Sequence, residues 1–239
     1  MNIYLSVVLA CFNEAEHLAS SYPILLKALR KINKPFEIIF VEDSSRDNTL
    51  EIIHRLIRKY PDIKTTLITH RQNLGRGKSV TDGFTKAQGL YVGYIDADLE
   101  IDPLYIKPAL QKLNQYDGIV GRRHYFFKFL LLHRFIATKI YALFVKMLFR
   151  LPVSDTESGF KFFKKEKILP VLKYARNSGW FWDTEIVFFS HKYGLKIGEI
   201  DVKYQKNFDK TSTVKTVSDS ITYFKNLVRL FLKINDQSN

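Results

Sequence analysis

The first half of the chain alternates short apolar runs with longer stretches whose apolar positions repeat at helical spacing. The apolar runs predict four strands, Tyr4–Phe12, Phe36–Val41, Lys64–Thr69 and Tyr91–Ile95. The helical spacing predicts four helices, Glu14–Lys31, Asn48–Tyr60, Gly77–Gln88 and Pro103–Asn114. Strands that alternate with helices of this length are typical of parallel βαβ units in an α/β fold.

The alternation is less regular in the second half. After Gly118–Gly121 the chain enters a basic and aromatic segment. Beyond it we expect a short strand near Phe160, a helix over Asp183–Tyr193 and a strand over Lys196–Tyr204. No internal repeat or Ser/Gly-rich linker divides the sequence, and 239 residues suffice for one sizeable core. We therefore expect a single domain over 1–239 with a specialised C-terminal half.

Two acids directly follow the apolar run Leu90–Ile95. In an open α/β sheet, ligands bind at the carboxyl ends of the strands. Asp96 and Asp98 are two residues apart and point the same way in extended chain, and Glu100 continues that face. Carboxylate oxygens suit Mg²⁺ or Mn²⁺ better than zinc, so a divalent ion that joins these acids to a diphosphate is one hypothesis. A solvated turn before a helix start at Asp102 is the alternative.

Polar residues also follow the first two expected strands. Asn13 and Glu14 come after the first, and Asp43 and Asp47 lie in the loop after the second. A carboxylate in such a loop can accept hydrogen bonds from a ribose or a base, or it can cap the next helix. We expect a ligand role for Asp43 and a capping role for Asp47.

The loop after the third expected strand, Arg71–Ser79, is basic and contains two glycines. It is not a P-loop, because Gln72 stands where that motif requires Gly. It still predicts a flexible basic turn at a helix start, where backbone N–H groups and the helix dipole favour phosphate. The sequence offers no zinc-ligand pair and no Gly-x-Ser-x-Gly elbow, so zinc and serine-hydrolase chemistry find no support.

The net charge of +13 is concentrated in the second half of the chain. Residues 1–119 hold 15 Lys/Arg against 14 Asp/Glu, whereas residues 120–239 hold 22 against 10. No acid occurs between Asp117 and Asp155, where basic and aromatic residues are interleaved. This pattern predicts an element on an anionic membrane surface, since charges interrupt its apolar runs too often for a span. Ordinary amphipathic packing with a solvated basic face is the alternative.

Three further features bear on where the protein works. Residues 213–239 predict a C-terminal amphipathic helix. Its basic stripe consists of Lys225, Arg229 and Lys233. The single Cys11 cannot form an intramolecular disulfide, which favours a packed thiol in a reducing compartment. Met1–Leu9 has no basic residue before its apolar run, unlike a signal peptide. We expect a cytoplasmic protein that associates peripherally with the inner face of a membrane.

Six ordered segments together resemble a known family. They are Val7–Glu14, Val41–Thr49, Asn73–Gly77, Asp96–Leu99, Gly121–Arg123 and Asp155–Lys161. They are similar to the motifs of family 2 glycosyltransferases, and in particular to those of polyprenyl (dolichyl) phosphate mannose or glucose synthases. The resemblance runs from about residue 5 to about residue 205. It implies a GT-A fold with a Rossmann-like, mostly parallel sheet flanked by helices, an inverting transfer, and a Mg²⁺ or Mn²⁺ ion.

The resemblance implies a nucleotide-sugar-binding half over residues 1–120. Asp98 matches the metal-binding acid of the DxD motif, Asp96 its partner toward ribose and metal, and Glu100 the third metal ligand, which is usually Gln in the mannose enzymes. Asp43 resembles the nucleobase or ribose contact. The implied nucleotide-sugar-binding residues are Asn13, Glu14, Asp43, Arg71, Gly75, Lys78, Asp96, Ala97 and Asp98.

The resemblance also implies an acceptor half over residues 121–212. Arg123 and Arg134 resemble contacts to the acceptor phosphate or the diphosphate. The implied acceptor-binding residues are Arg123, Arg134, Lys161 and Ser212. The chain departs from the mannose synthases at Ala10, Asn207, Lys210 and Thr213.

Three functions stay open at this point. A transferase that acts on a polyprenyl phosphate needs no protein base, because a phosphate monoester is already an adequate nucleophile near neutral pH. A transferase that acts on a saccharide or glycolipid hydroxyl needs one, and Asp183 or Glu185 is the candidate. The expected catalytic residues are therefore Asp98, Arg123, Arg134, Asp183 and Glu185.

The third function is that of a basic nucleic-acid-binding protein without catalysis, which the bulk charge permits. The acidic residues at the strand end would repel a phosphate backbone, and no nucleic-acid motif accompanies the basic segment. We expect a nucleotide-diphosphate sugar, a lipid-linked acceptor and an anionic membrane as partners, and no nucleic acid. A membrane-protein partner or a homo-oligomer stays open.

Overall fold

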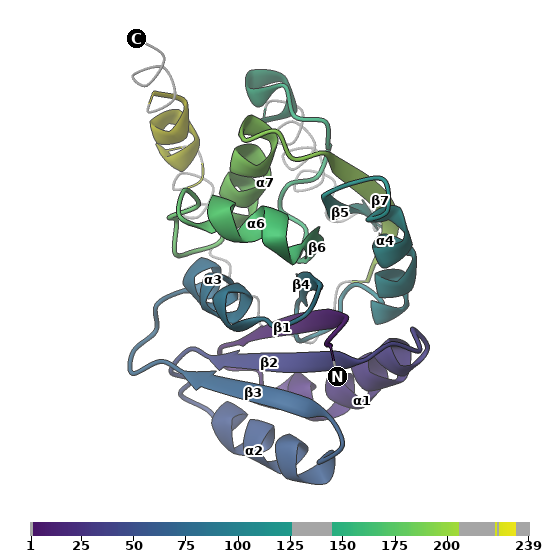
Figure 1. The fold of residues 1–239 in the computed structure, drawn as a ribbon. Coiled ribbons are helices and arrows are strands. Elements are labelled where there is room, and N and C mark those ends of the chain that lie inside the picture. The colour runs from purple at the N-terminus through teal and green to yellow at the C-terminus, as the bar shows by residue number, and fades with distance from the viewer. Residues whose placement is uncertain (1, 126–144, 206–222, 224, 233–239) are drawn as a thin grey trace. The chain divides into compact units, whose positions relative to one another are not determined.

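The computed structural model describes residues 2–125, 145–205, 223 and 225–232. Contacts group the chain into two compact units, residues 1–205 and residues 206–239. The first unit is a central sheet flanked by helices (Figure 1). In the second, residues 225–232 are helical. Within the described ranges, no helix has both the length and the apolar character of a membrane span.

The described residues of the first unit form a seven-stranded sheet in the order β3-β2-β1-β4-β6-β5-β7. The strands are β1 Leu5–Cys11, β2 Phe36–Glu42, β3 Lys64–Thr69, β4 Tyr91–Ile95, β5 Gly118–Tyr125, β6 Phe160–Lys164 and β7 Ile197–Tyr204. β6 runs antiparallel to its neighbours β4 and β5, and the other pairs are parallel. The expected α/β fold with a mostly parallel sheet is confirmed.

Helices pack on both faces of this sheet (Figure 1). They are α1 Ala15–Arg30, α2 Thr49–Lys59, α3 Arg76–Lys86, η1 Pro103–Tyr105, α4 Ile106–Lys112, α6 Lys165–Leu172 and α7 Trp182–Lys192. On one face, α1 and α4 share a core with alternate residues of the strands, including Leu5, Phe40 and Phe162. On the other, Phe84 of α3 meets Tyr94, Phe163 and Trp182 edge-on or tilted. The sheet is thus buried on both sides, as its apolar strands require.

Three expectations about elements were wrong or incomplete. The segment expected as one helix, Pro103–Asn114, is divided into η1 and α4. The regular pattern was expected to break after Gly118–Gly121, but β5 continues to Tyr125 because it pairs with β7 along its whole length. Helix α6 was not expected, and Pro170 lies inside it. For β5 the stabilising partner β7 is distant in sequence, so the local pattern carries a weak signal.

Candidate active site

The site lies where the connections of the sheet change direction. From β1 the chain moves to β2 and β3 on one side, and β4 lies on the other side of β1. Ligands of open α/β sheets bind at the carboxyl ends of the strands at such a switch point. Asn13 follows β1 and Asp96 follows β4, so both emerge there. The register pairs Val8 of β1 with Tyr94 of β4, which brings these two loops together.

Asp96 is held from several directions at this edge. Its Oδ1 accepts hydrogen bonds from Arg76 Nη2 at 2.6 Å and Nε at 3.2 Å, and its backbone N–H donates to Gly159 O at 3.1 Å. A Cβ at Gly159 would lie 1.7 Å from Asp96 Oδ2, so only glycine there leaves the carboxylate in this position. Desolvation and the charge of Asp98 raise the pKa of Asp96, against the opposing charge of Arg76.

Arg76 opens α3 and lies deep in the site, with its side chain 11% exposed. Its Nη1 donates to Asp183, and its guanidinium lies 5.0 Å from the ring centre of Tyr94 and 4.8 Å from that of Trp180. Burial by itself lowers the pKa of Arg76, but Asp183 and Asp96 outweigh it and raise the pKa well above its ordinary value. Sequence reasoning did not place Arg76 in the site, and its position between two glycines was the available signal.

A buried ion pair lies behind Arg76. Lys161 is fully buried, and its Nζ donates to Asp183 Oδ1 at 2.6 Å, Tyr94 Oη at 2.9 Å and Ser158 O at 2.5 Å. An ammonium group has three N–H donors, so these partners account for all of them. The acceptor contact expected of Lys161 has no N–H to use in this arrangement. Burial lowers the pKa of Lys161, and Asp183 opposes that shift.

Asp183 is only 1% exposed, and Lys161, Tyr94 and Arg76 all donate to its carboxylate. Helix α7 begins at Trp182 without a side-chain cap, so Asp183 is not its N-cap. A general base must reach the proton that it removes. In this structure both oxygens of Asp183 instead face cations or a hydroxyl of the protein. Its observed contacts are therefore those of a residue that holds Arg76 in place.

Asp98 and Glu100 continue the turn after β4. Asp98 Oδ1 accepts a hydrogen bond from the Glu100 N–H at 3.3 Å, and Tyr204 Oη donates to the carboxylate of Glu100. Leu99 between them has a positive φ of 52°, so the chain turns rather than continuing as extended chain. For this reason the three acids do not form one row. Within the described ranges, no three acids, histidines or cysteines are arranged as a metal site.

A divalent ion still fits the donor set of this turn. Asp96 and Asp98 are partly exposed carboxylates, and the side chain of Asp96 is 38% exposed. Mg²⁺ in nucleotide sites is commonly held by one or two carboxylates together with phosphate oxygens and water. Two acids at a strand end supply the protein part of such a site. A third protein ligand is not required.

Asp43 holds the basic turn, Arg71–Ser79, in place through hydrogen bonds. It is buried, and its carboxylate accepts hydrogen bonds from the backbone N–H groups of Leu74 and Gly75 at 2.8 Å each. His70 Nδ1 lies 2.6 Å from Asp43 Oδ1. The ligand role expected of Asp43 stays a prediction, and its observed contacts fix the loop that carries Arg76.

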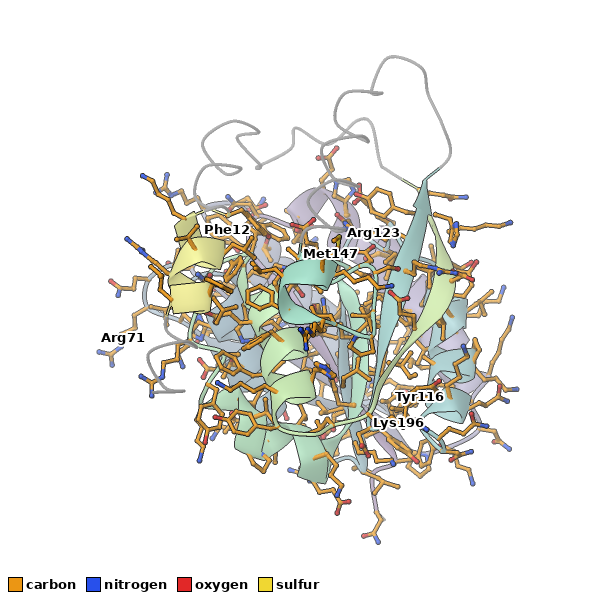
Figure 2. All side chains as sticks on the ribbon, turned by 90° about the horizontal axis from the view of Figure 1, so that it is seen from above. Phe12, Arg71, Tyr116, Arg123, Met147 and Lys196 are labelled. Carbon is orange, nitrogen blue, oxygen red and sulfur yellow. The ribbon has the colours of Figure 1, made fainter. Side chains whose placement is uncertain are left out.

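The basic turn does not offer the phosphate cradle that we expected. The N–H groups of Gly77 and Lys78 donate to Ser178 O at 2.7 and 3.2 Å, so protein atoms occupy them. The side chain of Lys78 pairs with Asp82. Arg71 is exposed and extends away from the protein at the edge of the molecule (Figure 2). The distant loop before α7 thus takes the donors that sequence reasoning had assigned to a ligand.

The loops after β1 and β2 are joined by hydrogen bonds. Asn13 Oδ1 accepts a hydrogen bond from the Arg46 N–H at 2.8 Å, and the Glu14 N–H donates to Thr49 Oγ1 at 2.8 Å. Asp47 accepts from the Thr49 N–H at 3.0 Å and from the N–H of residue 15 at 3.1 Å. Asp47 is not the N-cap residue of α2, which is Asn48. Its side chain nevertheless accepts the first N–H of both α1 and α2, so the expected contact with the helix start is present from one residue earlier.

A second charged cluster lies two strands from Asp96. Arg123 of β5, which Figure 2 labels, donates to Asp155 through Nε at 2.7 Å and Nη2 at 2.9 Å. Glu157 Oε2 lies 3.7 Å from Arg123 Nη2. Burial favours the neutral form of Asp155, but Arg123 outweighs it and lowers the pKa of Asp155. Burial raises the pKa of Glu157 to about 7, against the opposing charge of Arg123. Sequence reasoning did not single out Glu157.

The remaining expected residues have different positions. Glu185 accepts a hydrogen bond from the Asn177 N–H at 2.7 Å and so anchors the loop that contacts the basic turn. Ala97 is buried between the two acids. Arg134 and Ser212 lie outside the described residues, as does most of the acid-free segment.

Comparison with known proteins assigns the chain to a family. Residues 6–169 match the sequence profile described as Glycosyl transferase family 2. The chain belongs to this family. It is a glycosyltransferase, and the expected enzyme class is confirmed.

Curated relatives cover most of this glycosyltransferase. The Dolichyl-phosphate beta-glucosyltransferase of Dictyostelium discoideum is 30% identical over 96% of this chain and 74% of its own length. The Dolichyl-phosphate beta-glucosyltransferase ALG5A of Trichomonas vaginalis is 28% identical over 86% of this chain and 67% of its own length. Glycosyltransferase AglD of Haloferax volcanii is 27% identical over 87% of this chain and 34% of its own length.

Solved structures establish that this glycosyltransferase has the GT-A fold. Glucosyl-3-phosphoglycerate synthase from Mycobacterium tuberculosis, in complex with Mn²⁺, UDP and glucosyl-3-phosphoglycerate, superposes with a TM-score of 0.65 at 14% identity, over 97% of this chain and 79% of that chain. Mannosyltransferase PcManGT from Pyrobaculum calidifontis, in complex with GDP-Man and Mn²⁺, gives a TM-score of 0.55 at 15% identity, over 85% of this chain and 57% of that chain.

Proposed function

We propose that this glycosyltransferase moves a sugar, with inversion, from a nucleotide-diphosphate sugar to a polyprenyl phosphate at a membrane surface. The observation that carries the proposal is the placement of Asp96 and Arg123 on one edge of the sheet. Asp96 directly follows the pair Ile95–Phe160, and Arg123 lies three residues beyond the pair Val120–Lys161. Two strand spacings separate β4 from β5, about 10 Å. One sugar ring between a donor diphosphate and an acceptor phosphate suits that separation.

The donor side of the proposal uses Asp96 and Asp98. We assign a Mg²⁺ or Mn²⁺ ion to these two carboxylates, with Glu100 as a further ligand if it gives up its hydrogen bond from Tyr204. When bound, such an ion neutralises charge on the departing diphosphate. The complexes of relatives in fold with UDP or GDP-Man and Mn²⁺ support this choice. Asn13, Glu14 and Asp43 border the same edge and are proposed to receive the nucleoside.

The acceptor side uses Arg123. A guanidinium group suits bidentate recognition of phosphate, and Asp155 holds this one in a fixed orientation. A phosphate monoester needs no protein base near neutral pH, which agrees with the buried, fully engaged state of Asp183. The names of the Dictyostelium and Trichomonas relatives also support a lipid phosphate as acceptor and glucose as the first sugar to test. Arg134 and Ser212 stay proposed acceptor contacts.

A hydroxyl acceptor is the second candidate, and Glu157 is the observation that favours it. A half-buried carboxylate with a pKa of about 7 has the proton affinity of a general base at neutral pH. Glu157 lies beside Arg123, on the side of the site proposed for the acceptor.

Transfer to lipid tests both candidates. The purified protein is incubated with radiolabelled UDP-glucose or GDP-mannose, Mn²⁺ and a polyprenyl phosphate, and the label in the organic phase is counted. We expect label in that phase with wild type and a loss of at least about a hundredfold in Asp98→Asn. Asp62→Asn, in an exposed ion pair with Arg30, is the matched control and should keep activity. Label that appears only on an added saccharide, with none on the lipid, would instead support the hydroxyl acceptor.

A further inference from the structure

Arg76 supplies a positive charge to the proposed metal-binding acids from inside the protein. Two of its nitrogens donate to Asp96 Oδ1, and a third donates to the buried Asp183. We propose that this guanidinium makes binding of the divalent ion depend on the nucleotide diphosphate. The inference rests on the proposed assignment of the metal to Asp96 and Asp98, and it assigns an electrostatic role to Arg76.

The position of Arg76 is fixed, so its charge cannot easily move away when an ion arrives. Its guanidinium lies close to the rings of both Tyr94 and Trp180, and its partner Asp183 is held by Lys161. Removing the bond to Asp96 would leave the rest of these contacts in place. The charge beside Asp96 is therefore a built-in part of the site.

Charge balance explains why the ion should need the nucleotide. The charge of Arg76 offsets that of Asp96, which leaves the turn less negative than its three acids suggest. A divalent ion alone is attracted by the acids but repelled by Arg76. A diphosphate adds negative charge that both cations can share. With the diphosphate present, the ion is attracted by the acids and by the phosphates and is repelled less by Arg76. It therefore binds more tightly than it does alone.

This dependence would suit a transferase that exchanges its nucleotide in every cycle. Binding couplings are reciprocal, so an ion that binds better with the diphosphate also makes the diphosphate bind better. The ion and the donor would then load together, and the ion would be released with the product nucleotide. Direct contact between the ion and the diphosphate would give some coupling with any residue at position 76. A purely structural brace there predicts in addition that removing its charge does not tighten binding of the ion alone.

The test measures Mn²⁺ binding directly, from the electron paramagnetic resonance signal of the free ion, with and without UDP or GDP. In wild type we expect the nucleotide to tighten Mn²⁺ binding by at least about tenfold. In Arg76→Met, which removes the charge, we expect Mn²⁺ alone to bind about tenfold tighter and the nucleotide effect to shrink by the same factor. Arg76→Lys keeps the charge and should retain most of the wild-type coupling. Arg58→Met, at an exposed position of α2, is the control and should match wild type.

Two outcomes would overturn the inference. One is a wild-type Mn²⁺ affinity that is equal with and without nucleotide, and the other is an Arg76→Met variant that binds Mn²⁺ alone no tighter than wild type. If the thermal melt shows that Arg76→Met does not fold, Arg76→Gln is measured in its place. The comparison of wild-type Mn²⁺ affinity with and without nucleotide tests the inference in either case. A wild-type protein that binds no Mn²⁺ even with UDP or GDP would instead refute the metal assignment in the proposed function.

Discussion

Glu157 is a half-buried carboxylate beside Arg123, and burial raises its pKa to about 7. In an unfolded chain a glutamate has a pKa near 4.3. The folded protein therefore keeps a proton that the unfolded chain has lost between about pH 4.3 and pH 7. Stability falls as the pH rises through this window, and the full cost of ionising the buried group is present above it.

Glu157→Gln removes that ionisation and should flatten this part of the pH profile. We expect the variant to match wild type near pH 4 and to exceed it by about 3 kcal/mol in free energy of unfolding near pH 8, since the shift from about 4.3 to about 7 amounts to between two and three units and each unit corresponds to about 1.4 kcal/mol. Urea denaturation at several pH values measures the difference. Glu16→Gln, at a carboxylate that is 70% exposed, is the control. A difference that does not change with pH would contradict the prediction.

At the residue scale, the acids at strand ends could be predicted because each directly follows an apolar run. Asp96 and Asp98 were found in this way, and the contact of Asp47 with a helix start followed from its place before a helix. Arg76 and Asp183 were not linked in advance, because they are 107 residues apart and no periodicity connects them. Burial of an ion pair such as Lys161 with Asp183 depends on tertiary packing, which local patterns do not report.

At the element scale, the strands and helices of the first half were predictable because each has a continuous apolar run or a regular helical period. β5 was not, since its sequence mixes glycines with Arg122, Arg123 and His124, and it is stabilised by pairing with β6 and β7. The start of β6 matters most for the site. Just before it, Gly159 accepts a hydrogen bond from the N–H of Asp96, the residue that follows β4.

Gly159→Ala should displace Asp96 while leaving the sheet folded. The new Cβ would lie 1.7 Å from Asp96 Oδ2, so the carboxylate must move. We expect transferase activity to fall by at least about a hundredfold, because a displacement of about 1 Å in a catalytic site can cost that much. Activity and melting temperature are measured together.

Gly194→Ala separates this effect from backbone strain. Gly194 has a φ of 81° and open space around a new Cβ, so alanine there costs about 1 kcal/mol of stability without reaching the site. We expect this variant to melt lower and to keep its activity. Full activity in Gly159→Ala would show that the position of Asp96 is not critical.

At the scale of the whole molecule, the uneven charge makes a prediction about membranes. Residues 120–239 hold 22 basic residues against 10 acids, whereas residues 1–119 are nearly balanced. Basic residues near an anionic surface contribute about 1 kcal/mol each, and the attraction falls off within a Debye length of about 10 Å at 0.1 M salt. We expect the protein to float with vesicles that contain anionic lipid, and to remain unbound when the salt is raised to about 1 M, where the Debye length is about 3 Å.

Two triple variants with equal net charge locate the effect. In the first, Lys128, Lys139 and Lys146 of the acid-free segment are changed to Gln, which should weaken vesicle binding by at least about tenfold, since three charges contribute about 3 kcal/mol at most. In the second, three exposed lysines are changed to Gln, namely Lys27 of α1, Lys31 directly after α1 and Lys59 of α2. This change lowers the net charge by the same amount. If the acid-free segment itself binds the membrane, the first variant should bind vesicles clearly more weakly than the second. Equal weakening would mean that only the total charge matters, and equal flotation with neutral vesicles would contradict an electrostatic surface altogether.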